Sequence, residues 1–458
     1  MDCDEIYVSL LFPPSDYVSG ISVFKRIINN KKPADVLHLN VSSPDGEIHN
    51  FDDYINERIH IDLDCELDTP SCIVNSLKKA LDSLKKDYKK IYSRSWVANN
   101  HFIALEYKLL NQEVFWTAEF SDPLILNISN KVRNSKKFNL NDQKYIDHIN
   151  QHIIELNKKN GASYPLVENN SSVFFMAEYL TYLFSDKIIF TNENQREVML
   201  SQFSQDIRQL VIEKSEIQMH ATLDEEFYYL EDAKLDLEGS NINIAYFGRD
   251  YYSQRHFESL FYALDSLNHK FKDKLRIYFF IDDDKLIKKL IRPLKSHENF
   301  VFKKPLDYFK FLNATTQFDV LIVNDVMTRD VWPINPYLPS KLSDYLGSSR
   351  DIWALYEDGS TLSKFDLRYK SDIADFASCR NQLIEIFKDN GFDDNDYSVE
   401  EEYLLQRLTT LNNLFEKEFN SNLKLKKEND SLKNDLDEVI SSNSWKLTRP
   451  LRNLRSKK

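Results

Sequence analysis

The chain has 458 residues, of which 42% are hydrophobic and 13% aromatic, and its formal net charge is −13. This length suits two domains of roughly 150–200 residues with an extension, and the apolar content excludes disorder along the whole chain. The acidic balance argues against a protein coated in nucleic acid, although a mean charge can hide a local basic patch.

Only 8 residues are glycine and 4 are cysteine, which argues against Gly-rich loop designs and against a disulfide scaffold. The cysteines are scattered and form no CxxC pair, so we expect reduced thiols of the kind found in the cytosol. The acidic N-terminus lacks the basic segment of a signal peptide. No apolar run reaches the roughly 18 residues of a membrane span, and the nearest one, 173–184, predicts a buried helix.

Short apolar strands alternate with helices through the first half of the chain. The predicted strands are 6–12, 35–39, 90–93, 114–118 and 187–191, and the predicted helices are 22–30, 76–86, 101–110 and 142–157. This alternation favours a parallel sheet covered by helices on both faces. The polar stretch 130–170, rich in Asn and Lys, predicts an insertion on that sheet.

An acidic, turn-rich stretch, 223–240, predicts a linker, and a second series of strands and helices follows it. The strands are 242–247, 275–281, 300–303, 318–324 and 352–356, and the helices are 257–268, 285–295, 306–313, 341–346 and 379–388. The fold class is therefore α/β, with Rossmann-like domains at 1–222 and 241–392 that face a cleft. Such folds bind ligands at the carboxyl ends of their strands, which places the site in that cleft.

Two further segments follow residue 391. Apolar residues at three- and four-residue spacing predict a coiled-coil helix over 398–440 and hence a homo-oligomer or a coiled-coil partner, the alternative being a helix that lies on its own domain. Residues 441–458 carry six basic side chains, no acidic one, and Trp445. This composition predicts a tail that binds an anionic membrane surface. A solvated basic end and a contact with nucleic acid are the alternatives, and we expect no nucleic-acid partner.

The stretch NPYLPSKLSDYLGSSRDIWALYEDGSTL, residues 335–362, resembles the donor-site segment of nucleotide-sugar-dependent glycosyltransferases with the GT-B fold, particularly bacterial surface-polysaccharide enzymes. In those enzymes a PSK-x-x-[DE]-Y-[LM] turn and helix precede a strand and a Gly-Ser loop. Other pieces agree in order: NIAYFGRDYYSQRHFESLFYAL in the donor domain, FWTAEFSDPL, SDKIIFTNENQREVML and QMHATL in the acceptor domain, and a SxSWKLTxPLR tail. The resemblance covers roughly residues 1–390, and only 339–360 are specific.

The resemblance implies a donor site in the second domain. Cleavage of a nucleotide sugar builds charge on the leaving diphosphate, which backbone N–H groups and cations stabilise. We expect Ser340 to cap a helix and Lys341 to reach a phosphate, while Arg249 or Arg255 clamps the diphosphate. An ordinary helix start and exposed arginines are the alternatives.

Glycines and an acidic side chain complete the expected donor site. Gly248 follows a buried strand where the backbone could approach a phosphate, and Gly359 with Ser360 predicts a tight loop near the donor. Asp344 matches the acidic position that holds ribose or sugar hydroxyls, the alternative being a solvated helix carboxylate. Many such enzymes carry two glutamates eight positions apart, but Pro336 stands eight before Asp344. This departure leaves retention or inversion open.

In the first domain the resemblance implies acceptor-side residues. Ser19 and Gly20 could form a loop beneath the reacting sugar. His101 is expected to contact the transferred sugar, or else to be a core histidine. Asp122 could orient an acceptor hydroxyl or act as the base, or else be a turn residue before proline. Glu193 is a further acceptor-side candidate.

The run Asp282-Asp283-Asp284 contains a DxD, which holds a metal in the other glycosyltransferase fold, but here it opens a Lys-rich helix. We therefore expect no metal and no cofactor besides the nucleotide-sugar co-substrate. The sequence predicts a cytoplasmic glycosyltransferase of hexosyltransferase type, peripheral on the inner face of the cell membrane, that extends a lipid-linked surface glycan. The alternatives are a catalytically inactive GT-B scaffold that organises glycan-synthesis enzymes through its coiled coil, and an enzyme with another donor such as a polyol phosphate.

Overall fold

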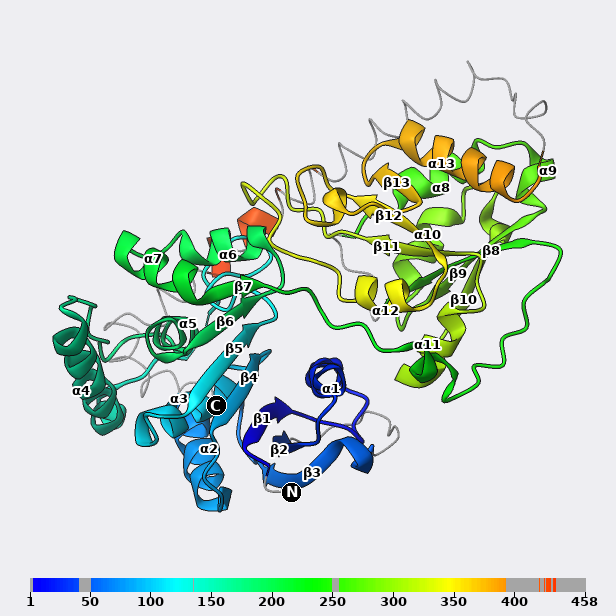
Figure 1. Ribbon diagram of the computed structural model, residues 1–458. Helices are drawn as coiled ribbons and strands as arrows, with labels where there is room; N and C mark the ends of the chain where they lie inside the picture. Colours follow the sequence, from blue (N-terminus) through cyan, green and yellow to red (C-terminus); the bar gives the residue numbers. More distant parts are fainter. Residues whose placement is uncertain are drawn as a thin grey trace, which may run out of the picture. The chain divides into compact units, whose positions relative to one another are not determined.

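A computed structural model describes residues 3–40, 51–134, 136–248 and 255–392. The chain through residue 394 forms one compact unit built on two parallel sheets (Figure 1). In the second unit, which begins at residue 395, the structure describes only residues 420, 424, 426–429 and 431–433, all helical and exposed. The predicted coiled coil therefore lies largely outside the described residues, and the predicted basic tail lies wholly outside them.

The first sheet has seven parallel strands in the order β3-β2-β1-β4-β5-β6-β7. The strands are β1 (Glu5–Leu10), β2 (Ala34–Asn40), β3 (Ile55–Asp62), β4 (Lys90–Ser95), β5 (Phe115–Phe120), β6 (Lys187–Phe190) and β7 (Ser215–Ile217). The chain order reverses direction between β1 and β4, so their carboxyl ends flank a crevice where such folds bind ligands.

Helices cover both faces of this sheet (Figure 1). They are α1 (Val18–Asn30), α2 (Pro70–Ser83), α3 (Ala98–Leu110), α4 (Gln143–Asn160), α5 (Val173–Phe184), α6 (Glu193–Leu200) and α7 (Gln205–Lys214), with 3-10 turns η1 (Asp52–Tyr54) and η2 (Leu140–Asp142). Alternate residues of β1 point to opposite faces: Ile6 and Val8 pack with α2 and α3, whereas Tyr7 packs with α1. The predicted insertion contains α4, whose apolar side joins the same core as α3.

The second sheet has six parallel strands in the order β10-β9-β8-β11-β12-β13. They are β8 (Ile242–Phe247), β9 (Leu275–Phe280), β10 (Phe300–Lys303), β11 (Val320–Asn324), β12 (Asp351–Tyr356) and β13 (Tyr369–Asp372). The helices are α8 (Glu258–Asp265), α9 (His269–Lys272), α10 (Lys285–Ile291), α11 (Tyr308–Thr315), α12 (Lys341–Gly347) and α13 (Phe376–Asp389), with 3-10 turns η3 (Glu225–Tyr229), η4 (His297–Asn299) and η5 (Leu362–Lys364). The crevice of this sheet lies between β8 and β11.

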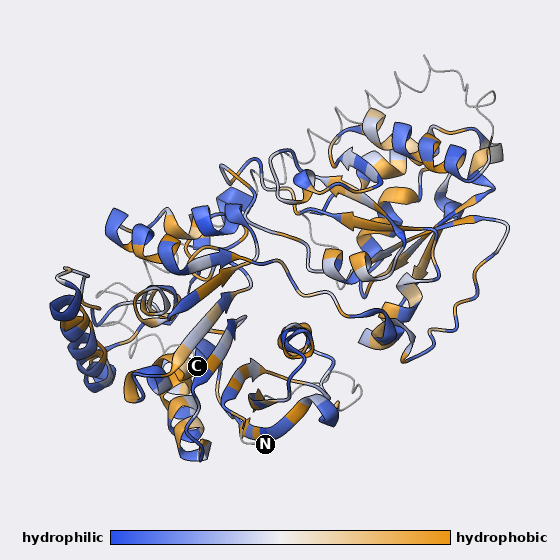
Figure 2. Cartoon of the chain, in the orientation of Figure 1, coloured by the Kyte–Doolittle hydropathy of each residue, from blue (hydrophilic) through white to orange (hydrophobic). Residues whose placement is uncertain are grey.

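Two buried hydrophobic clusters hold the compact unit together, and apolar residues concentrate on the strands and on the helix faces that cover them (Figure 2). The first cluster belongs chiefly to the first sheet. The second cluster joins α1 to the second sheet, since it includes Phe24, Ile27, Tyr308 and Leu342. The two domains thus share an apolar contact through α1, and a further one where Trp332 of the second domain packs in the first cluster.

The linker predicted over 223–240 also takes part in this packing. Phe227 and Tyr228, in η3, are buried in the second cluster. The hydroxyl of Tyr228 donates to the backbone carbonyl of Asp344, and a Cβ at Gly347 would approach that hydroxyl to 2.1 Å. Glycine at position 347 therefore permits the linker to lie directly on α12.

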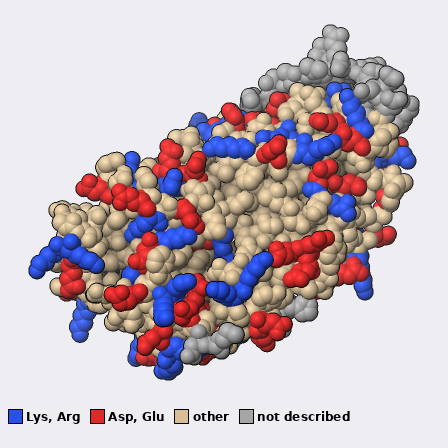
Figure 3. Space-filling view, viewed as in Figure 1, with Lys and Arg blue, Asp and Glu red and all other residues tan. Residues whose placement is uncertain are grey.

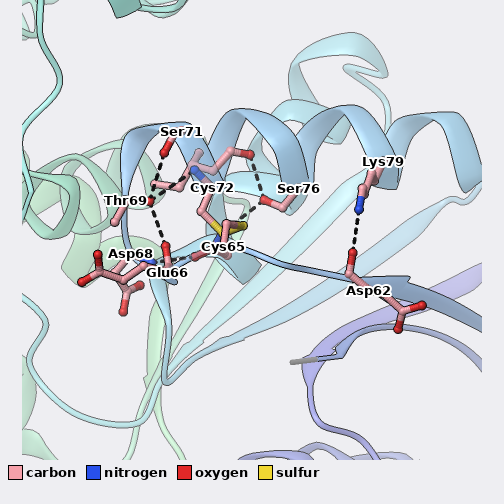
Figure 4. The surroundings of a disulfide bond; sticks show 11 residues. Asp62, Cys65, Glu66, Asp68, Thr69, Ser71, Cys72, Ser76 and Lys79 are labelled. Atoms are coloured by element: carbon pink, nitrogen blue, oxygen red, sulfur yellow. Dashed lines mark hydrogen bonds between the residues drawn. A yellow bond between two sulfur atoms is a disulfide. The ribbon is translucent and has the colours of Figure 1, made fainter. Parts of the chain in front are cut away.

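The expectation of reduced thiols is wrong for one pair of cysteines. Cys65 and Cys72 form a disulfide with Cα atoms 5.5 Å apart, while Cys3 and Cys379 are free. Cys65 lies in the loop after β3, and this loop folds back so that Cys72 falls in the first turn of α2 (Figure 4). Thr69 caps the helix there by accepting from the Cys72 backbone N–H.

Candidate active site

Two adjoining pockets lie at the carboxyl ends of both sheets. We name the first, of about 340 Å³, the charged pocket, because Lys25, Arg26, Glu119, Lys341 and Asp344 line it. The second, of about 400 Å³, is the aromatic pocket, because Tyr17, Trp96 and Tyr337 line it. Both pockets include residues of each domain, and Val18, Ser22, His220 and Ser340 line both of them.

A buried ion pair joins the two domains inside the charged pocket. The Lys25 ammonium, on α1, donates to Asp344 Oδ1 at 2.8 Å and to Ser343 Oγ at 2.9 Å, both on α12. The Tyr308 hydroxyl also donates to Asp344 Oδ1, at 2.8 Å. Lys25 and Asp344 are only 5% and 6% exposed, so the carboxylate expected to hold ribose is already hydrogen-bonded within the protein.

A second ionic cluster surrounds Glu119 at the end of β5. Arg26 and Arg94 donate to its two carboxylate oxygens at 2.8 and 3.2 Å, and the Tyr92 hydroxyl donates at 2.7 Å. Burial alone would raise the pKa of Glu119, but the two guanidinium groups lower it to about 2. Glu119 therefore stays ionised and serves to position the arginines rather than to accept a proton.

Two donor-site predictions meet in the charged pocket at the start of α12. The Lys341 ammonium lies 3.7 Å from the centre of the Phe311 ring, and both residues line the pocket. Ser340 also lines it, but the prediction that its side chain caps the helix is wrong. Its φ and ψ of −62° and −28° are already helical, whereas a capping residue needs an extended backbone.

Gly248 and Arg255, two residues of the expected donor site, line different pockets. Gly248 lines the charged pocket directly after β8, and a Cβ there would approach the Tyr246 hydroxyl to 2.5 Å. Arg255 lines the aromatic pocket and donates to the carbonyl of Asn324 at 2.7 Å and to its Oδ1 at 3.0 Å. Arg249 lies outside the described residues.

The aromatic pocket contains Asp122, the candidate base, immediately beyond β5. Burial raises the pKa of this carboxyl, and Arg94 and Arg133 oppose that shift. A carboxylate with a raised pKa is a better proton acceptor near neutral pH than an exposed one. Burial, with Arg94 next, lowers the pKa of His220 to about 3, so its imidazole is neutral at physiological pH.

His101 is not in either pocket and is a core histidine instead of a contact to the transferred sugar. It is 1% exposed, and its Nδ1 lies 2.8 Å from Ser93 Oγ. Its ring packs against Phe120 at 4.9 Å, and burial lowers its pKa to about 3. Almost the whole of α3 is buried in the first domain, so a residue near its start is enclosed in the core and does not reach the cleft.

Ser19 and Gly20 form the first turn of α1 rather than a loop. Ser19 lines the aromatic pocket, as expected of an acceptor-side residue. Gly20 lines neither pocket, and its role is packing: a Cβ there would lie 2.1 Å from the carbonyl oxygen of Leu11. Only glycine lets α1 approach the β1 exit this closely.

Glu193 and the Gly359–Ser360 loop also lie outside both pockets. Glu193 is exposed, but its neighbour Asn194 donates to the carbonyls of Asn335 and Gly359 at 3.0 and 3.1 Å. The loop predicted to face the donor therefore joins the two domains instead. Gly359 has a φ of +77°, which favours glycine in this turn.

Several pocket residues were not predicted from the sequence: Tyr17, Lys25, Arg26, Trp96, Glu119, His220 and Tyr337. Two signals were present. Glu119 and His220 stand inside segments that resemble the acceptor domain, FWTAEFSDPL and QMHATL. Lys25 interrupts an otherwise apolar helix face, where a buried lysine requires a partner.

The Asp282–Asp284 run does not form one cluster. Asp282 lines the charged pocket, Asp283 accepts from the Lys285 backbone N–H, and Asp284 pairs with Lys288 at 2.7 Å. Among the described residues no group of three or more His, Cys, Asp or Glu side chains is arranged to hold a metal. No helix within the described ranges is long and apolar enough to cross a membrane, and charges of both signs are interspersed on the face in Figure 3.

Two Rossmann-like α/β domains in one chain confirm the α/β part of the predicted fold class and agree with a GT-B fold. No family model matches the sequence, and no curated protein matches it. The chain is similar to the structure of HepE from Anabaena in complex with UDP, with 10% identity, a TM-score of 0.49, and coverage of 85% of this chain and 91% of that one.

Two further solved structures are similar in the same way. The α,α-trehalose-phosphate synthase from Burkholderia xenovorans, in complex with glucose-6-phosphate, has 10% identity and a TM-score of 0.49, covering 83% of this chain and 92% of that one. The ADP-heptose LPS heptosyltransferase II of E. coli has 9% identity and a TM-score of 0.42, covering 84% of this chain and 99% of that one.

Proposed function

We propose that this protein transfers a sugar from a nucleotide diphosphate donor to a glycan acceptor. The observation that carries the proposal is the pair of adjoining pockets at the carboxyl ends of two Rossmann-like sheets. The charged pocket would hold the donor and the aromatic pocket the acceptor. The reacting atoms would meet near Ser22, His220 and Ser340, which line both.

The charged pocket has the chemistry that a nucleotide sugar requires. Lys25, Arg26 and Lys341 offer three cations for a diphosphate, two of them from the first domain and one from the second. Phe247 and Phe280 supply an apolar wall at the ends of β8 and β9, suited to a nucleobase. Asp344 would exchange its bond to Lys25 for one to a ribose or sugar hydroxyl.

We assign the base to Asp122 in an inverting direct displacement. The acceptor hydroxyl would attack the anomeric carbon and lose its proton to Asp122. The bond from that carbon to the diphosphate would break, and its electron pair would leave with the nucleotide diphosphate. Lys341 would stabilise the charge on that leaving group. Each role matches the pocket that the residue lines.

Binding of nucleotides to the full chain tests the donor assignment. When UDP, ADP or GDP is added in excess, at least one of them should raise the melting temperature of the protein. The reason is that a ligand that binds only the folded state stabilises that state. Lys341→Ala should weaken that binding about tenfold or more, since charged hydrogen bonds contribute roughly 1.5–3 kcal/mol. Lys364→Ala is the matched control, because Lys364 is exposed and lines neither pocket. Undiminished binding by Lys341→Ala would remove the donor assignment.

We propose further that the acceptor is a lipid-linked surface glycan and that the enzyme works at the inner face of the membrane. The six basic residues of 441–458 support this proposal, since each contributes about 1 kcal/mol near an anionic leaflet. A chain ending at Val439 should lose binding to vesicles that contain phosphatidylglycerol. Persistent binding would mean that the tail is not the anchor.

A further inference from the structure

Trp96 is an exposed tryptophan at the mouth of the aromatic pocket. It directly follows β4, and 49% of it is exposed, whereas Trp116, Trp332 and Trp353 are all buried. Exposing so large an apolar side chain costs free energy that burial would recover. Such residues at the rim of a polar pocket mark ligand-binding surfaces.

Tyr17 extends the apolar surface made by Trp96. Their rings meet edge to face with centres 5.2 Å apart, and both line the aromatic pocket. Tyr17 follows β1, Trp96 follows β4 and Asp122 follows β5, which are three neighbouring strands of the first sheet. Consecutive strand ends therefore place two aromatic rings beside the candidate base.

Two hydroxyl groups in the same pocket are buried without a hydrogen-bond partner among the described residues: Ser19 Oγ and the Tyr337 hydroxyl. Ser19 is 3% exposed. A buried hydroxyl that makes no hydrogen bond costs roughly 1–3 kcal/mol, so native proteins seldom retain one without a purpose. These two groups come from different domains and line one pocket.

We propose that the aromatic pocket is a subsite for one pyranose ring of the acceptor, stacked on Trp96, with ring hydroxyls bonded to Ser19 and Tyr337. A pyranose combines an apolar C–H face with a rim of hydroxyls, which matches an aromatic surface beside unsatisfied polar groups. A lipid chain would leave both hydroxyls and Asp122 buried against hydrocarbon, at a cost in free energy. The inference rests on the proposed function and specifies which part of the acceptor enters the pocket.

Titration of the full chain with methyl glycosides of glucose, galactose and N-acetylglucosamine, followed by NMR, tests the subsite. At least one glycoside should bind, and Trp96→Ala should weaken its affinity about tenfold, as expected for loss of an aromatic contact. Trp96→Phe should retain part of the affinity. Phe115→Ala is the matched control, since Phe115 is 46% exposed at the start of β5 and lines neither pocket.

Ser19→Ala and Tyr337→Phe distinguish binding from a structural role. Each should weaken glycoside binding about fivefold, the value of one hydrogen bond, while leaving the melting temperature unchanged or higher. Nucleotide binding should stay within twofold in all of these variants. If a nucleotide binds but no glycoside does, or if Trp96→Ala binds the glycoside normally, the subsite assignment is wrong. If no nucleotide binds the natural chain, the donor proposal itself fails.

Discussion

The two pockets differ in how their polar groups are satisfied. In the charged pocket, Lys25 is bonded to Asp344 and Arg26 to Glu119, both pairs being deeply buried. In the aromatic pocket, the hydroxyls of Ser19 and Tyr337 have no partner among the described residues. One pocket is internally paired, and the other has unused hydrogen-bonding capacity.

This difference determines how each pocket can accept a ligand. A ligand of the charged pocket must exchange existing ion pairs for its own, so binding and the contact between the domains are coupled. A ligand of the aromatic pocket can add hydrogen bonds without breaking any to Ser19 or Tyr337. The charged pocket is therefore suited to a strongly charged ligand, and the aromatic pocket to a neutral one rich in hydroxyls.

The largest expected effect is on turnover, and it comes from a change to the candidate base in the aromatic pocket. Asp122→Asn should lower turnover by about 10²–10⁴, the usual contribution of a general base, with nucleotide affinity unchanged. In the natural chain, turnover should rise with pH through the raised pKa of Asp122, and this rise should disappear in the variant. Rates would be measured from release of the nucleoside diphosphate. Asp358→Asn, at an exposed position, is the control, and an equal loss there would exclude a specific role for Asp122.

The next effect concerns the ion pair in the charged pocket. Lys25→Ala should lower the free energy of unfolding by about 4 kcal/mol, because it leaves the Asp344 carboxylate buried without its cation. The double variant with Lys25→Met and Asp344→Asn should lose much less stability than Lys25→Ala, since neither charge of the pair then remains buried. Urea unfolding followed by circular dichroism measures both.

An exposed ion pair supplies the contrast for this measurement. Lys288→Ala breaks the pair between Lys288 and Asp284, whose side chains are 54% and 32% exposed. It should cost less than about 1 kcal/mol. Equal losses in the two lysine variants would contradict the view that the charged pocket is held by a buried pair.

The smallest effect concerns the support beneath Asp122. Glu178, on α5, accepts from the backbone N–H groups of Leu124 and Ile125 at 2.7 and 2.9 Å, and burial raises its pKa to about 7. The unfolded chain releases this proton near pH 4.5, so the folded state binds more protons between these values. The contribution of Glu178 to the free energy of unfolding is therefore fully present below about pH 4.5. It is lost as the pH rises to 7, by at most about 3 kcal/mol.

Glu178→Gln should remove that part of the pH dependence while keeping the amide oxygen as an acceptor for both N–H groups. The free energy of unfolding, measured between pH 5 and 8, should then decline less in the variant than in the natural chain. An unchanged slope would show that Glu178 does not titrate in this range.

The central strands of both sheets could be predicted from the sequence, whereas three of the four edge strands could not. β8, in the middle of the second sheet, is buried along its whole length, and its predicted bounds agree with the structure. The edge strand β10 was also predicted, because three of its four residues are apolar. β3, β7 and β13 lie at sheet edges, where polar residues are common because one side of the strand is unpaired. Helix α2 was predicted to start at residue 76, but Thr69 and Pro70 start it earlier as cap and first residue.

Some residues that line the charged pocket could be identified from their position along the chain alone. Gly248, Lys341 and Asp344 follow strands or begin a helix in one domain, and all three line the charged pocket. Lys25 and Trp96 matter because of what lies opposite them in space, which local spacing does not encode. The prediction for His101 was wrong because the sequence did not reveal that almost the whole of α3 is buried in the core.

The disulfide also limits the conformations of the unfolded chain. Joining Cys65 to Cys72 closes a short loop and removes chain entropy from the unfolded state, which is equivalent to about 2.5 kcal/mol for a ring of this size. Asp68 lies inside the ring, and its carboxylate accepts from the Ala98 backbone N–H at 2.7 Å, where α3 begins two residues after Trp96. Reduction would return this entropy to the unfolded chain and so lower the free energy of unfolding. The affected loop lies next to the acceptor side of the cleft, although neither cysteine lines a pocket.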